Sequence, residues 1–199
     1  MGKTPHYPKT PSRRLSGREA LTAPDGKPIG CVTDFWRWAH SNLTDNTERG
    51  ILAEYFVARA MGADRAARTN WEPYDLLAED IRIEVKASGY IQSWGQKELS
   101  RIKFGIPKTA AWNQDTGQYE GGKTRHADVY VFCLLNHRAQ ESLNPLDLSQ
   151  WEFYVVPTKV INERYANRER VTLKSLQAAG ILPVPFEGIR SAVLQAAKP

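Results

Sequence analysis

The fold is decided by the stretch Tyr74–Ala87, which reads YDLLAEDIRIEVKA. Side chains of a strand alternate between its two faces, so Glu84 and Lys86 are expected on one face and their neighbours on the other. An apolar run that begins after Asp75 leads through a short acidic turn into this strand. The pattern predicts two carboxylates and an ammonium group close together, a combination that can hold a hard cation and polarise a water molecule.

The spacing of Glu84 and Lys86 is not distinctive by itself. An acidic residue two places before a lysine also occurs in the turn-rich segment Asp25-Gly26-Lys27. The Glu84 copy differs because it lies in an alternating, β-branched segment that is typical of a strand. A solvent-facing row of charges with a cross-strand ion pair would explain that segment equally well, so the rest of the chain must decide.

The segment from Thr47 to Gly62 has apolar residues at helical spacing and ends in a glycine that is typical of a helix C-terminus. Glu54 lies among the apolar positions of this helix. Burying a carboxylate is costly unless it is paired or bound to a metal. Two interpretations stay open: a functional carboxylate, or a boundary residue paired with Arg59 or Arg82.

The order of these parts, a helix with Glu54, a strand with Asp75 and a strand with Glu84-x-Lys86, resembles the PD-(D/E)xK nuclease superfamily over residues 42–135. The chain departs from the motif because Tyr74 separates its proline from Asp75. The resemblance implies an α/β fold with a mixed central β-sheet flanked by helices. It also implies a restriction-endonuclease-like core and an endonuclease that hydrolyses DNA.

The resemblance assigns roles to individual residues. Asp75 and Glu84 would bind one or two Mg²⁺ ions, with Mn²⁺ as a substitute, helped by the backbone carbonyl of Val85. Lys86 would orient or activate the attacking water and stabilise developing charge. Glu54 would complete the metal shell directly or through water, and the products would carry 5′-phosphate and 3′-hydroxyl ends.

The chain after this strand is rich in aromatic and basic residues, which suits contact with phosphates and bases. A β-hairpin with inward-packed aromatics and solvated lysines is the alternative. The expected nucleic-acid-binding residues are Gln92, Lys97, Arg101, Lys103 and Lys108. The match of Gln92 to a glutamine in some branches of the superfamily is loose, and a surface position is the plainer interpretation.

Composition agrees with a nucleic-acid partner. The 199 residues carry a formal net charge of +5, and 41% of them are hydrophobic. No apolar run is long enough to span a membrane, and the two cysteines form no metal-binding pattern, so a cytoplasmic protein with reduced thiols is expected. Residues 1–30 are expected to form a flexible basic arm rich in Pro and Gly, and residues 31–199 the nuclease domain, with its core at about 42–157.

Further elements are expected along the chain. Residues 32–41 suggest a short helix packed on the core by its aromatics, and residues 127–135 and 151–157 suggest strands. Helices are expected at 158–165, 173–179 and 189–197, of which the last would cover the sheet or form a homodimer.

Three functional hypotheses follow from these patterns. The first is a Mg²⁺-dependent endonuclease acting in restriction, repair or defence. The second is a non-catalytic nucleic-acid-binding module on the same fold, and the third is an α/β protein in which Glu84 and Lys86 form a structural ion pair. The nuclease hypothesis requires Glu54, Asp75, Glu84 and Lys86 to converge in one cleft.

Overall fold

A computed structural model describes residues 10–70, 72–113 and 117–198. Its centre is a four-stranded mixed sheet in the order β3-β4-β8-β9, which confirms the predicted α/β class. The parallel pair is β4–β8, and β3–β4 and β8–β9 are antiparallel. The sheet comprises β3 (Leu76–Ala78), β4 (Ile81–Gly89), β8 (Val129–Leu135) and β9 (Trp151–Pro157).

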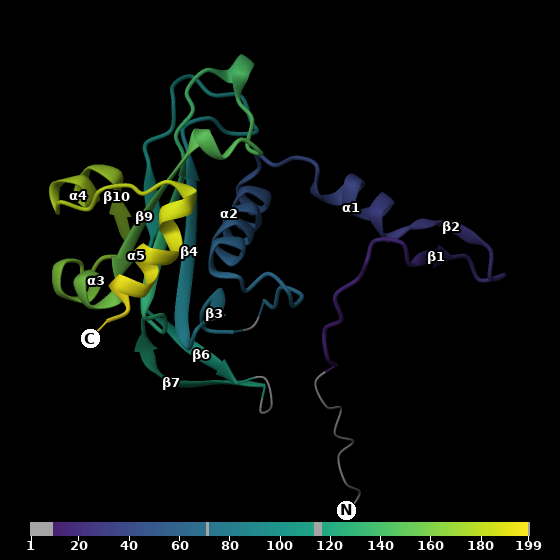
Figure 1. Cartoon of the computed structure of the whole chain (residues 1–199), viewed down its shortest axis with the longest axis horizontal. Coiled ribbons are helices and arrows are strands. Elements are labelled where there is room, and N and C mark those ends of the chain that lie inside the picture. The colour runs from purple at the N-terminus through teal and green to yellow at the C-terminus, as the bar shows by residue number, and fades with distance from the viewer. Residues whose placement is uncertain (1–9, 71, 114–116, 199) are drawn as a thin grey trace, which may run out of the picture.

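Helices cover both faces of this sheet (Figure 1). The apolar run of β8 is buried along its whole length, as a central strand covered on both faces must be. One face packs against α2 (Asn46–Met61) and α5 (Ile189–Ala196). The other face packs against α3 (Thr158–Arg164), α4 (Leu173–Ala178), β5 (Lys103–Gly105) and β10 (Arg170–Thr172).

The helix that carries Glu54 has well-defined ends. At its start, the Asp45 side chain accepts a hydrogen bond from the backbone N–H of Thr47. At its end, Gly62 adopts a left-handed conformation with a φ of 70°, which confirms the predicted glycine stop. Within the described ranges, no helix has the length and apolar character needed to cross a membrane.

The strand β4 lies where the alternation of its residues predicts. Ile83 and Val85 are buried against α2, in the same layer as Val129 and Val131 of β8. The tight turn between β3 and β4 is formed by Glu79-Asp80, both at positive φ. Because successive side chains of a strand point to opposite faces, Glu84 and Lys86 lie on the other face of the sheet, in register with Tyr130 and Phe132 of β8.

The basic region after β4 contains a two-stranded β-hairpin that is separate from the central sheet. The strands β6 (Thr109–Asn113) and β7 (Gln118–Thr124) pair as an antiparallel hairpin. Arg125 at its end is buried, and its guanidinium donates to the carbonyl oxygens of Ile106, Tyr165 and Arg168. This arginine therefore holds the layers together and is not free to contact nucleic acid.

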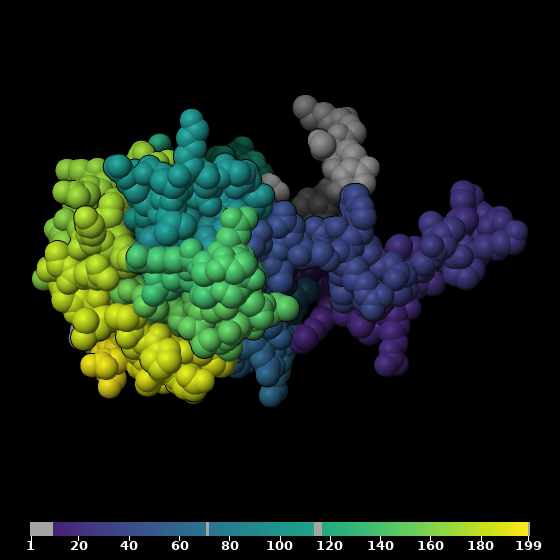
Figure 2. Space-filling view, turned by 90° about the horizontal axis from the view of Figure 1, so that it is seen from above, coloured from purple at the N-terminus to yellow at the C-terminus, as the bar shows by residue number. Residues whose placement is uncertain are grey.

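The described part of the N-terminal arm is not featureless. It contains a hairpin of β1 (Ala20–Thr22) and β2 (Pro28–Cys31), followed by α1 (Val32–His40). This arm projects from the body of the molecule (Figures 1 and 2). The expectation that α1 packs on the core through its aromatics is wrong, because Trp38 is 84% exposed and Trp36 is 38% exposed. The first nine residues of the predicted arm lie outside the described residues.

Three short 3₁₀ helices complete the described elements: Gln140–Ser142, Leu148–Gln150 and Phe186–Gly188.

Candidate active site

The site is built around a gap in the edge of the sheet. The edge strand β3 begins its pairing at Leu76, which lies opposite Ile83 of β4. Beyond this point the edge of β4 would be unpaired, but Asp75 replaces the missing strand. Its backbone N–H donates to the carbonyl of Ile83 at 3.1 Å, and its Oδ2 accepts from the N–H of Val85 at 2.7 Å. By the alternation of backbone groups, the Val85 carbonyl points to the same edge.

Glu84 and Lys86 reach this edge from the face opposite α2. The Lys86 ammonium lies 2.6 Å from the Glu84 carboxylate and 3.8 Å from the Asp75 carboxylate. All three side chains are partly buried, with exposed fractions between 19% and 31%. The predicted carboxylates and ammonium group therefore do lie side by side.

Burial perturbs the two partners of the closest ion pair. Desolvation raises the pKa of Glu84, and the neighbouring Asp75 adds to this shift while Lys86 opposes it. Desolvation alone would lower the pKa of Lys86, but the carboxylates of Asp75 and Glu84 outweigh it and leave that pKa raised. Lys86 is thus a firmly protonated ammonium, surrounded by acidic groups that repel one another.

Glu54 approaches from α2, on the other face of the sheet. Its carboxylate accepts two hydrogen bonds from Arg68, from Nε at 2.5 Å and from Nη2 at 2.9 Å. The predicted alternative, in which Glu54 pairs with Arg59 or Arg82, is wrong about the partner, because Glu54 pairs with Arg68. These two arginines pair instead with Asp64 and Asp128.

The Glu54–Arg68 pair belongs to the same electrostatic cluster as Asp75. Burial raises the pKa of Glu54 despite the bonds from Arg68, and the charge of Asp75 raises it further. The sequence carries no pattern that would have singled out Arg68, because it lies in the connection between α2 and β3 and becomes a neighbour of Glu54 only in the fold.

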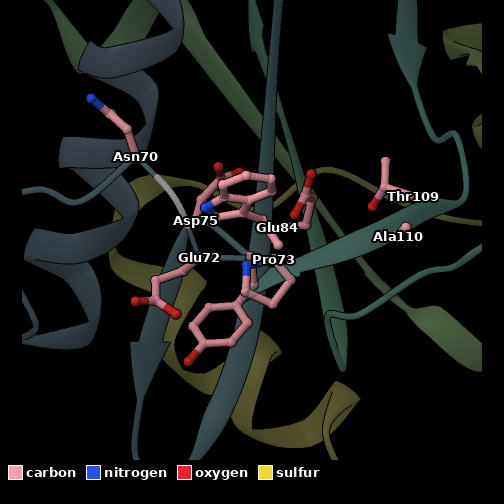
Figure 3. Close-up of a pocket in the computed structure, with 9 residues that line it drawn as sticks. Asn70, Glu72, Pro73, Asp75, Glu84, Thr109 and Ala110 are labelled. Atoms are coloured by element: carbon pink, nitrogen blue, oxygen red, sulfur yellow. The ribbon is translucent and has the colours of Figure 1, made fainter. Parts of the chain in front are cut away.

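A pocket of about 210 Å³ opens over the carboxylates (Figure 3). Asp75 and Glu84 line it together with residues of the α2–β3 connection and of β6. The other lining residues are Asn70, Glu72, Pro73, Tyr74, Thr109, Ala110 and Trp112. The β6–β7 hairpin thus forms one wall of the pocket that contains the two carboxylates.

The donors in this pocket suit a hard cation. Mg²⁺ is usually held by one or two carboxylates and keeps several waters or substrate oxygens. Asp75 and Glu84 are such a pair of carboxylates, and the Val85 carbonyl lies at the same sheet edge. Among the described residues, no three His, Cys, Asp or Glu side chains form a complete metal cage. Glu54 is bonded to Arg68 and does not line this pocket, but it lines a neighbouring cavity together with Asp75. The predicted convergence is therefore shown for Asp75, Glu84 and Lys86, whereas Glu54 shares a cavity with Asp75 alone.

The expected nucleic-acid-binding residues are scattered. Lys108 directly precedes Thr109 in the wall of the pocket. Gln92 lies beyond the far end of β4 and has structural partners: its amide donates to the Gly89 carbonyl and its oxygen accepts from Arg49. Gly89 lies five positions after Glu84, which is about 16 Å along a strand.

The three basic residues between Gln92 and Lys108 also have positions that do not adjoin the pocket. Lys97 is exposed in the loop after β4, and Arg101 is exposed just before β5. Lys103 lies in β5, opposite Thr172 of β10.

Comparison with known families is consistent with this geometry. A family model described as bacteriophage T4 endonuclease IV matches residues 37–172. The chain belongs to this endonuclease family. The match includes Glu54, Asp75, Glu84 and Lys86, and it leaves out the β1–β2 hairpin and the first half of α1. A comparison with curated proteins found no match.

The hydrogen bond between Asp75 and Val85 yields a testable prediction. Replacing Asp75 by Ala leaves the Val85 N–H without its acceptor and should lower the free energy of unfolding by about 1 kcal/mol. Asp75→Asn keeps an acceptor oxygen and removes a negative charge from the cluster, so it should be at least as stable as the wild type. Urea unfolding of the three proteins, with amide exchange of Val85 followed by NMR, measures both effects. Equal exchange rates in Asp75→Ala and the wild type would contradict this account of the edge.

Proposed function

We propose that this protein is a Mg²⁺-dependent endonuclease that hydrolyses phosphodiester bonds in DNA, with a site of the PD-(D/E)xK type. The observation that carries the proposal is the meeting of Asp75, Glu84 and Lys86 at one sheet edge in a chain of an endonuclease family. A purely structural ion pair would not need the second carboxylate, whose presence raises the cost of burying Glu84.

In the proposed site, Asp75, Glu84 and the Val85 carbonyl would hold the ion. Bound Mg²⁺ would act as a Lewis acid on the phosphate and lower the pKa of a water molecule. Mn²⁺ would substitute, since both ions favour oxygen ligands.

Lys86 contributes as a cation in this mechanism. Because its pKa is raised, it does not take a proton from water near neutral pH. Its ammonium group orients the attacking water and stabilises the negative charge that develops on the phosphate. The water oxygen bonds to phosphorus and loses a proton to the solvent, the bond from phosphorus to the 3′ oxygen breaks, and the 3′ oxygen takes up a proton from the solvent. The products are a 5′-phosphate and a 3′-hydroxyl.

The DNA would approach over the β6–β7 hairpin. Tyr119 on this hairpin is 72% exposed and makes an edge-to-face contact with Trp112, which lines the pocket. Lys108 and Lys123 are exposed at the base of the hairpin and add positive charge. One chain supplies the complete set of proposed catalytic side chains, so the proposal does not require a homodimer. Restriction, repair and defence are the settings in which we place such an activity.

Cleavage of supercoiled plasmid tests the proposal directly. The wild type should nick or linearise the plasmid with Mg²⁺ or Mn²⁺ and leave it intact with EDTA. Lys86→Ala and Asp75→Asn should each lower the rate by about a hundredfold or more, since each removes charge stabilisation or a metal ligand.

Lys174→Ala is the matched control for the lysine substitution, because it removes an exposed lysine of α4 that lines neither cavity and should cut like the wild type. Metal-dependent cutting that survives Lys86→Ala would contradict the site. DNA binding without cutting by any of these proteins would favour the non-catalytic module.

The Glu54–Arg68 pair gives a second prediction. If Glu54 completes the metal shell directly or through water, Arg68 competes with the metal for it. Glu54→Gln should then raise the Mg²⁺ concentration needed for half-maximal cleavage, and Arg68→Ala should lower it. Titration of the cleavage rate with Mg²⁺ measures both. A shift in the same direction for the two variants would show that Glu54 serves Arg68 instead of the metal.

A further inference from the structure

A second and larger cavity, of about 710 Å³, lies between the N-terminal arm and α2. Its walls include Trp36 from α1, Tyr55 from α2 and Arg68 from the α2–β3 connection. Asp75 lines this cavity as well as the smaller pocket over Glu84, so the two hollows meet at a proposed catalytic residue. The volume falls within the range of about 300–1,000 Å³ that is typical of ligand-binding pockets.

The arm is held in place over this cavity by specific contacts. The Arg14 guanidinium donates to the carbonyl oxygens of Asp64 and Arg65 at 2.7 and 3.1 Å. Gly17 is buried with a φ of 89°, and a β-carbon there would lie 3.1 Å from the Trp36 ring and still closer to Thr33. The absence of a side chain at Gly17 therefore lets the backbone at this residue pack against Trp36, and this contact fixes the position of the indole ring within the arm.

The chemistry of the cavity suits a nucleotide. Trp36 and Tyr55 are aromatic, and both are partly exposed, at 38% and 49%. Arg14 supplies positive charge on the arm side, next to apolar surface from α2, and Arg13 beside it is paired with Glu19. The cavity also contains acidic groups, each of them paired: Asp64 with Arg59, Glu54 with Arg68 and Asp75 with Lys86.

The path of a nucleic-acid strand connects the two hollows. A phosphate attacked at Asp75 and Glu84 has one nucleotide on each side along its strand. With one of these in the small pocket beside Trp112, the other would reach the arm cavity across Asp75, which lines both hollows.

The geometry points to the arm cavity as the binding site for the nucleotide that adjoins the scissile phosphate, with its base against Trp36 and Tyr55. This inference rests on the proposed function. It extends that function by a substrate-binding element, the arm residues Arg13, Arg14 and Trp36 of the cavity lining, which lie outside the range matched by the endonuclease family.

Trp36 and Trp38 form a matched pair for the test. Both are exposed tryptophans of α1, but Trp38 does not line the cavity. Binding of a fluorescein-labelled DNA oligonucleotide, single-stranded and duplex, is measured by fluorescence anisotropy in EDTA so that nothing is cleaved. Trp36→Ala should weaken binding about tenfold, as expected for the loss of a base-stacking partner, and Trp38→Ala should change it less than about twofold. Equal binding by Trp36→Ala and Trp38→Ala would overturn the inference.

Two further variants separate stacking from packing. Trp36→Phe keeps an aromatic face and should bind more tightly than Trp36→Leu, which keeps only apolar bulk. The same loss of affinity in the Phe and Leu variants would overturn the stacking role. This holds also where the arm misfolds in both variants, because Trp36 would then matter for packing and not for stacking.

An abasic series locates the nucleotide. Oligonucleotides that each lack one base are compared in binding to the wild type and Trp36→Ala. At one position the difference between the two proteins should vanish, because the base that meets Trp36 is already absent. A difference that persists at every position would show that Trp36 acts through the structure of the arm, and it would overturn the inference.

Failure of the inference and failure of the proposed function are distinguishable. A wild type that binds DNA with this Trp36 dependence but does not cleave plasmid contradicts only the nuclease proposal. A wild type that cleaves but shows no Trp36 dependence contradicts only the cavity assignment.

Discussion

The structure depends on one missing stretch of β-pairing. The edge strand β3 begins only at Leu76, and the Asp75 carboxylate accepts the hydrogen bond from the N–H of Val85 that an earlier strand residue would have accepted. An edge N–H left unpaired in a partly buried position would be costly, so this hydrogen bond fixes the Asp75 side chain at the sheet edge. The same gap leaves room for the pocket over Asp75 and Glu84. A longer β3 would close the edge and remove the site.

The cluster of Glu54, Asp75 and Glu84 is electrostatically unfavourable when no cation is bound. Glu54 and Glu84 are both partly buried, and the pKa of each is raised chiefly by desolvation, with a further rise from the negative charge of Asp75. Lys86 and Arg68 offset part of this repulsion, one from each face of the sheet. A divalent cation between Asp75 and Glu84 would offset more of it, which is a physical reason to expect such an ion beyond the resemblance of the motif.

The parts of this architecture that depend on local pattern could be predicted from sequence. The apolar run of β8, the alternation of β4 and the glycine stop at Gly62 each follow from periodicity or backbone preference within a few residues. Partners that depend on the fold could not be predicted. Arg68 pairs with Glu54 across fourteen residues, and the aromatic residues of α1 point to solvent and to the arm cavity where core packing was expected. The amphipathic pattern of a short helix shows which of its faces is apolar, but it does not show which part of the protein that face contacts.

Our central proposal is that Asp75 and Glu84 would hold a divalent ion at the sheet edge. Crystals grown with Mn²⁺, examined by anomalous diffraction at the manganese edge, test it most directly. We predict an anomalous peak within about 2.0–2.6 Å of carboxylate oxygens of both residues, as expected for hard cations with oxygen ligands. Manganese bound elsewhere on the chain, with the Lys86 ammonium still seated between Asp75 and Glu84, would contradict it.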